Sequence, residues 1–223
     1  TDNLRYFTTL VERSKSVSSI LFASSGAVYK PSLTALSENS PLVERVASVN
    51  KTNAYAQSKL DSEEVVQNIS SSKIRVSIAR CFAFCGPELP LTSHFAVGCF
   101  VSDVLAGRPI HIKATCPVFR SYLHTDDLVK WLMVMVTDER ASGQILNVGS
   151  QNAVSLLAIA KTLAKHFKLT VKLAIPEMEY NTRTPKSYFP DVSKANRLLD
   201  LEPTESSIEA VLRMAETIKN SET

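Results

Sequence analysis

Glycine is scarce in this chain of 223 residues: the sequence holds six glycines, where an average composition would give about 16. None of them lies in a GxGxxG or GxxxxGK pattern, so the sequence contains no glycine-rich loop that could hold phosphates at a helix N-terminus. Apolar runs, such as residues 131–136, are far shorter than the roughly 20 residues of a membrane span. The N-terminus also lacks the layout of a signal peptide. We therefore expect a cytoplasmic protein without membrane contact.

Metal-binding cysteine pairs and concentrated positive charge are also missing. The four cysteines, Cys81, Cys85, Cys99 and Cys116, form no CxxC pair and have no histidine at zinc-ligand spacing, so we expect reduced thiols and no metal site. Lys and Arg number 25 against 22 Asp and Glu, which gives a net charge of +3, and the basic residues are scattered. This distribution argues against nucleic acid as a partner.

What the sequence does contain is an alternation of helix and strand patterns. Residues 4–14 have apolar side chains at helical spacing, residues 20–23 form a short apolar run, residues 55–68 predict a second helix, and residues 74–79 a second strand. This order predicts an α/β fold with a parallel sheet, in which ligands bind beyond the carboxyl ends of the strands.

A looser pattern follows Gly86. It predicts helices over 95–106, 126–136, 155–167 and 207–219, and strands over 110–112, 121–124 and 145–148. We expect Thr125 to cap the helix over 126–136, with Asp126 and Asp127 in its positive first turn. Trp131 lies on the apolar face of this helix and is expected in the core.

The most informative polar residues are two serines and a Tyr-Lys pair. Ser24 and Ser25 end the first predicted strand, and Tyr55 and Lys59 are four residues apart, so they share one face of a helix. An adjacent ammonium lowers the pKa of a tyrosine from about 10, which suits the pair to proton transfer. A Tyr-x-x-x-Lys pattern alone is common, and its position between two strands makes it informative here.

Several segments resemble the NAD-dependent epimerase/dehydratase family, extended short-chain dehydrogenases/reductases that act on nucleotide sugars. Residues 22–29 (FASSGAVY) and 53–59 (NAYAQSK) are similar to the serine-bearing strand end and the Tyr-x-x-x-Lys helix of this family. Residues 80–87 (RCFAFCGP), 120–127 (RSYLHTDD) and 147–149 (NVG) are similar to its Arg-x-Phe-Asn-x-x-Gly-Pro, Arg-Asp-x-x-x-x-Asp-Asp and Asn-x-Gly motifs. The five matches lie in the order of the family, which makes them jointly specific.

The resemblance implies catalytic and cofactor-binding roles. Tyr55 would be the general base, and Lys59 would bind the nicotinamide ribose and lower the tyrosine pKa. Ser25 would hydrogen-bond the sugar hydroxyl that is oxidised. Ser24 and Phe82 would contact the NAD cofactor, with Phe82 lining the nicotinamide pocket.

The resemblance also implies how a nucleotide-diphosphate sugar is bound. Arg120 would clamp the diphosphate, with Arg183 as a second arginine, because guanidinium groups suit paired phosphate oxygens; a solvated surface position is the alternative for each. Two departures bear on the substrate. Gly26 and Ala27 stand where 4,6-dehydratases of the family have Asp-Glu, which argues against that reaction. Ala83 replaces an Asn that commonly contacts the sugar.

A third departure concerns the start of the fold. The family begins with a strand, a glycine-rich turn and a helix that bind the NAD pyrophosphate, and this sequence begins on the helix before the fourth strand. We expect a partial Rossmann-like parallel sheet, without the N-terminal strands 1–3, over residues 1–86. Residues 87–223 are expected to form a small C-terminal α+β substrate-binding part, from which a strand at about 144–149 returns to the sheet.

Two functional hypotheses stay open. The first is the C-terminal portion of an NAD-dependent nucleotide-sugar epimerase, or of a related oxidoreductase. The second is a truncated, catalytically inactive family member, acting as an assembly or binding module or present as a fragment. We expect this chain by itself to bind NAD weakly or not at all and to turn over no sugar nucleotide. With strand 20–23 at the edge of the sheet, we also expect a homodimer or a larger homo-oligomer.

Overall fold

The computed structural model describes residues 9, 11, 13–14, 16–44, 51–69, 74–91 and 95–221, with the side chains of 51–53 excepted. Its strands are β1 (Ser19–Ser25), β2 (Arg75–Cys81), β3 (Phe84–Cys85), β4 (Ile110–Ile112), β5 (Val118–Arg120), β6 (Leu123–His124), β7 (Ile145–Val148), β8 (Val154–Ser155), β9 (Val171–Leu173) and β10 (Lys186–Tyr188). Its helices are α2 (Lys51–Gln67), α3 (Ala96–Leu105), α4 (Thr125–Thr137), α5 (Leu156–Phe167), α6 (Glu177–Thr182), α7 (Ser193–Leu199) and α8 (Ser207–Ser221), with the short 3-10 turns η1 (Gly26–Val28) and η2 (Glu139–Ala141).

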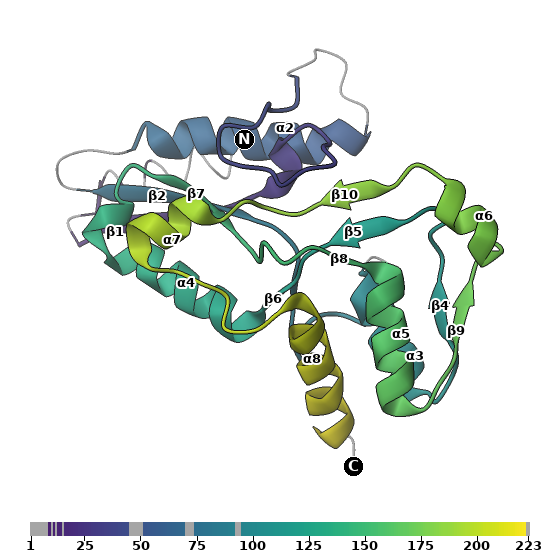
Figure 1. Ribbon diagram of the computed structural model, residues 1–223. Helices are drawn as coiled ribbons and strands as arrows, with labels where there is room; N and C mark the ends of the chain where they lie inside the picture. The colour runs from purple at the N-terminus through teal and green to yellow at the C-terminus, as the bar shows by residue number, and fades with distance from the viewer. Residues whose placement is uncertain are drawn as a thin grey trace.

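A parallel sheet of order β1-β2-β7 forms one half of the molecule. Ser25 pairs with Cys81, and Cys81 pairs with Val148, so the three strands end at the same edge. Helix α2 covers one face of this sheet, and α4 and α7 cover the other (Figure 1). The α/β architecture predicted from the sequence is confirmed, and the strand predicted at 145–148 joins the sheet as β7.

The other half lies beyond the carboxyl ends of these strands. It contains a mixed sheet of order β10-β5-β8 and the strand pairs β4-β9 and β3-β6. Helices α3, α5 and α8 pack around these strands (Figure 1). Phe100, Ile110, Ile159 and Met214 belong to their shared apolar core. This half therefore stands directly beside the edge where a parallel sheet binds its ligands.

The strand predicted at 121–124 is confirmed only for residues 123–124. The chain forms β5 and β6 instead, with a break at Ser121 and Tyr122. The backbone N–H of Tyr122 donates to Ser207 Oγ at 2.9 Å. That hydrogen bond to α8 uses the donor that a continuous strand would place in its ladder.

The predicted cap of α4 is also wrong. His124 caps the helix, and its Nδ1 accepts from the backbone N–H of Asp126 at 3.2 Å. Thr125 is already the first helical residue. Asp126 and Asp127 lie in the first turn, and Trp131 is fully buried, as predicted.

The remaining differences concern the start of one helix, a helix that lies largely outside the described residues, and short elements that the sequence did not indicate. Helix α2 begins at Lys51 rather than at residue 55, and the helix predicted over 4–14 falls largely outside the described residues. The short elements β8, β9, β10, α6 and α7 were not predicted. Among the helices that the structure describes, none combines the length and the apolar character needed to cross a membrane.

Candidate active site

Helix α2 brings Tyr55 and Lys59 to the carboxyl end of β1. The Lys59 Nζ donates to the carbonyl oxygen of Ala23 at 2.8 Å. It lies 5.8 Å from the centre of the Tyr55 ring and 5.1 Å from the centre of the Phe22 ring. Tyr55 is 55% exposed. The predicted Tyr-Lys pair is therefore assembled on one helix face and accessible to a ligand.

Ser25 and the aromatic rings beside it form the next part of the site. The Ser25 Oγ accepts from the backbone N–H of Ala27 at 3.2 Å, which starts the η1 turn. A Cβ atom added to Gly26 would lie 2.6 Å from Phe82 Cζ and 2.6 Å from the Tyr188 hydroxyl oxygen. Glycine at this position therefore lets the two rings close over the end of β1, with ring centres 4.8 Å apart.

Tyr188 is a site residue that the sequence did not indicate. It lies in β10, opposite Arg120 of β5, and the Arg120 guanidinium carbon is 5.3 Å from the centre of its ring. Burial raises the pKa of Tyr188 to about 12, although hydrogen bonding with the Ser25 side chain and the charge of Arg120 act in the opposite direction, and a charge on Tyr55 would raise it further. Tyr188 therefore links Ser25, Tyr55 and Arg120. No motif marks it, because only the pairing of β10 with β5 places it there.

A cavity of about 370 Å³ opens beside these rings. Of the twelve described residues that line it, five are aromatic and one is charged: Phe82, Ala83, Phe84, Leu89, Phe95, Ala96, Val97, Val118, Arg120, Tyr122, Leu156 and Tyr188. Burial lowers the pKa of Arg120 from its ordinary value, and its Nη1 donates to the carbonyl oxygen of Phe119 at 3.0 Å. The cavity thus offers aromatic surfaces and one guanidinium to a ligand.

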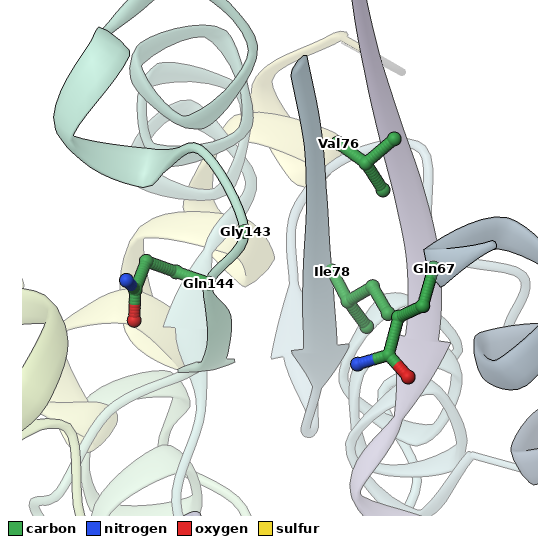
Figure 2. Close-up of a pocket in the computed structure, with 5 residues that line it drawn as sticks. All are labelled: Gln67, Val76, Ile78, Gly143 and Gln144. Carbon is green, nitrogen blue, oxygen red and sulfur yellow. The ribbon is translucent and has the colours of Figure 1, made fainter. Parts of the chain in front are cut away.

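A second hollow, of about 220 Å³, lies near the other end of the main sheet, and Figure 2 shows its lining residues. They are Gln67 at the end of α2, Val76 and Ile78 on β2, and Gly143 and Gln144 before β7. None of the residues predicted for the active site lines this hollow.

The structure places Ser24 in a buried polar network rather than in the cavity. Its Oγ donates to Glu63 Oε1 at 2.5 Å, and Arg80 donates to the two Glu63 oxygens at 3.0 and 2.7 Å. The side chains of Glu63 and Arg80 are each 5% exposed. Arg80 Nη1 also donates to the Tyr29 hydroxyl at 3.0 Å, which donates to Asn147 Oδ1 at 2.8 Å. The motif residues Arg80 and Asn147 therefore join β2, β7 and α2 inside the protein.

Arg183 lies apart from the cavity. It follows the last turn of α6, and its guanidinium is ion-paired with Glu179 one turn earlier. It is not among the residues that line the cavity around Arg120. Of the predicted site residues, the structure brings Ser25, Tyr55, Lys59, Phe82 and Arg120 together, and it places Ser24 and Arg183 elsewhere.

Comparison with known proteins agrees with this arrangement. Residues 1–149 match the model of the NAD dependent epimerase/dehydratase family. The chain belongs to this family. It is 25% identical over 202 residues to UDP-glucuronate 4-epimerase 1 of Arabidopsis thaliana, and this match covers 83% of the chain and 45% of that protein. It is 23% identical over 207 residues to the uncharacterized UDP-glucose epimerase YtcB of Bacillus subtilis, which covers 92% of the chain and 62% of that protein.

One further curated relative and one solved structure show how much of the length and of the fold is shared. UDP-glucuronic acid decarboxylase 6 of Arabidopsis thaliana is 25% identical over 130 residues, which covers 58% of the chain and 37% of that protein. The chain therefore spans less than two thirds of the length of each of these curated proteins. The crystal structure of UDP-glucuronic acid 4-epimerase from Bacillus cereus in complex with NAD has a TM-score of 0.77 at 20% identity, covering 97% of this chain and 64% of that chain. This epimerase shares the fold.

Proposed function

We propose that this chain carries the catalytic and sugar-binding residues of an NAD-dependent nucleotide-sugar epimerase or of a related oxidoreductase. The observation that supports the proposal most is the meeting of Ser25, Tyr55 and Lys59 at the carboxyl end of β1. Tyr188, which is hydrogen-bonded to the Ser25 side chain, connects this group to the cavity that Arg120 lines. The curated relatives are named for UDP-glucuronic acid, UDP-glucuronate or UDP-glucose, and these names agree with a nucleotide-sugar substrate.

The residues present fit one end of NAD. The Tyr55 hydroxyl and the Lys59 ammonium are suitable partners for the hydroxyls of the nicotinamide ribose, and the buried Phe82 ring offers an apolar wall for the nicotinamide. The sequence contains no glycine-rich turn for the pyrophosphate. We therefore assign only the nicotinamide end of the cofactor to residues of this chain.

The proposed chemistry is the reversible oxidation of a sugar hydroxyl. NAD, held at its nicotinamide end by Tyr55, Lys59 and Phe82, would supply reversible uptake and return of a hydride at the sugar carbon. The Tyr55 phenolate oxygen accepts the hydroxyl proton, and Ser25 holds the same sugar oxygen by a hydrogen bond. Lys59 supplies a positive charge one helical turn from Tyr55. When the hydride is returned to the sugar carbon, Tyr55 gives the proton back to the sugar oxygen, and the cycle is complete.

Substrate binding is assigned to the second half of the chain. Arg120 binds the diphosphate, because it is the charged residue of the cavity wall and lies across the ring of Tyr188. Arg183 stays a weaker candidate, because Glu179 already neutralises it. We place the division between the catalytic part and the substrate-binding part after residue 86, with β7 returning to the first part.

We also propose that copies of the chain associate along β1. This strand ends the sheet order β1-β2-β7, so among the described residues its outer edge has no neighbouring strand. A homodimer or a larger assembly at micromolar concentration, measured by light scattering, is the expected result. A monomer would contradict the proposal.

The catalytic proposal is tested in a version of the enzyme that also contains a pyrophosphate-binding turn, by adding NAD and UDP-glucose or UDP-glucuronate and following the sugar by NMR. We expect Tyr55→Phe to lower turnover by about 10²- to 10⁴-fold, the loss typical of a general base, with sugar-nucleotide affinity nearly unchanged. Turnover by Tyr55→Phe within threefold of wild type would remove Tyr55 from the mechanism. Binding of the sugar nucleotide without turnover in wild type would favour the second hypothesis, a catalytically inactive binding module.

A further inference from the structure

The cavity has a reacting end and a charged wall. Gly26, Phe82 and Tyr188 meet at the reacting end, where Ser25 closes the strand. The Arg120 guanidinium carbon lies over the Tyr188 ring, 5.3 Å from its centre. If the proposed function holds, a sugar hydroxyl at Ser25 places the neighbouring diphosphate near Arg120.

The charge of this cavity is small compared with that of its ligand. Among the twelve described residues that line it, Arg120 is the single charged one, and one of its nitrogens already donates to the carbonyl oxygen of Phe119. A nucleoside diphosphate has about two negative charges when bound as an ester, so the phosphates alone exceed the positive charge of the wall. A sugar carboxylate would add a further charge without a partner, and burial of an unpaired carboxylate is strongly unfavourable.

The wall around the reacting end is built for neutral groups. Ala83, Phe82 and Phe84 present apolar surface to the cavity. The hydroxyls of Ser25 and Tyr188 are neutral, and the buried Tyr188 phenol keeps its proton at physiological pH. Neutral donors and acceptors of this kind match sugar hydroxyls. Lys59 is a further cation at this end, and its ammonium donates a hydrogen bond to the carbonyl oxygen of Ala23.

We propose that this site selects nucleotide sugars with a neutral hexose and rejects those with a hexuronate. The inference deepens the proposed function and rests on it. Family membership does not decide the question, since the names of the relatives include both UDP-glucuronate and UDP-glucose enzymes. The balance of charge around Arg120 favours the neutral sugar.

Titration calorimetry of the full chain with UDP, UDP-glucose and UDP-glucuronate tests the proposal, with the dTDP forms in parallel. We expect UDP-glucose to bind at least tenfold more tightly than UDP-glucuronate, and UDP-glucuronate to bind no more tightly than UDP. UDP-glucuronate binding as tightly as UDP-glucose, or more tightly, would overturn the selection for a neutral sugar and leave the proposed function standing. Failure of every nucleotide to bind would instead overturn the assignment of a nucleotide sugar.

A pair of variants tests whether charge is the cause. Ala83→Lys adds a cation to the cavity wall, and Ala83→Met adds similar bulk without charge. The ratio of the two sugar-nucleotide affinities should shift at least fivefold toward UDP-glucuronate in Ala83→Lys and stay within twofold in Ala83→Met. An unchanged ratio in a folded Ala83→Lys protein would contradict the proposal. If this variant does not fold, the wild-type titration still decides.

Discussion

The two halves of the site are held by different kinds of interaction. On the sheet side, the carboxylate of Glu63 accepts two hydrogen bonds from Arg80 and one from Ser24, all in the protein interior. On the cavity side, Arg120 stands among aromatic and aliphatic side chains that pack on the apolar core around Ile159 and Met214. Hydrogen bonds have direction and fix one alignment of α2 on the strands. Apolar packing defines volume and shape.

This difference separates the alignment of α2 on the sheet from the choice of ligand by the cavity wall. Lys59 lies one turn along α2 from Glu63, so the alignment that the Glu63–Arg80 pair fixes also holds Lys59 against β1. The cavity wall can change residue by residue without disturbing that alignment. We therefore expect substitutions near Glu63 to act on the whole sheet half and substitutions in the cavity wall to act on ligand choice.

Glu63→Ala is expected to give the largest loss of stability. It leaves the Arg80 guanidinium buried without its partner, and we expect the free energy of unfolding to fall by about 3–5 kcal/mol. Glu177→Ala, at the exposed ion pair with Lys161, is the control and should cost less than about 1 kcal/mol. Urea denaturation measures both. Equal losses in the two variants would show that burial of the pair has no special role.

Met214→Ala tests the stability of the cavity side, again as a change in the free energy of unfolding. Met214 is fully buried in the apolar core, so we expect a loss of about 2–5 kcal/mol from the lost contacts and the cavity left behind. The same substitution at Met178, which is 84% exposed, is the matched control and should change stability by less than about 0.5 kcal/mol. A loss at Met214 no greater than at Met178 would contradict the view that packing holds this half.

Arg120→Met should weaken nucleotide binding by about 10- to 100-fold, because the variant removes the charge-assisted hydrogen bonds proposed for the diphosphate. The dependence of affinity on salt should decrease with it. Arg183→Met is the comparison, and we expect a smaller effect because Arg183 is paired with Glu179 outside the cavity lining. Calorimetry with UDP at two salt concentrations gives both quantities. Equal effects would place Arg183 at the diphosphate as well.

The smallest expected effect is at Asp191, whose carboxylate accepts from the Ser193 backbone N–H at 2.8 Å. Hydrogen bonds from the Ser193 side chain and backbone lower the pKa of Asp191. A lowered folded-state pKa stabilises the protein above the ordinary value near 4, and this stability is lost as pH falls through the folded value. Asp191→Ala should cost about 0.5–1 kcal/mol at pH 7, where solvent screens the partly exposed group. The difference from wild type should shrink below pH 4; a difference independent of pH would exclude the carboxylate as its source.

Sequence patterns were sufficient where an element is long or apolar throughout. The run 20–23 and the strand at 145–148 lie in the observed parallel sheet, and α2 carries the predicted Tyr55 and Lys59 face. Pairing between distant residues was not readable from the sequence. Strand β10 has three residues and is defined by its register with β5, so Tyr188 gave no local signal.

Two residue assignments differed for local reasons. Neighbouring residues of a strand point to opposite faces, so Ser24 and Ser25 cannot both face the site, and Ser24 turns toward Glu63. Histidine is not a favoured helix cap, and its role at His124 depends on the hydrogen bond from Asp126. In both cases the sequence shows a residue that can form hydrogen bonds, but the surrounding structure decides which partner its side chain meets.

Gly26 sets the spacing between the two halves of the molecule. Its missing side chain leaves room for the tips of Phe82 from the sheet half and Tyr188 from the cavity half, and a single methyl group would come within 2.6 Å of each. Any larger residue would therefore force the Phe82 and Tyr188 side chains to move. The close approach of these two rings beside Ser25 therefore depends on the absence of a side chain at residue 26.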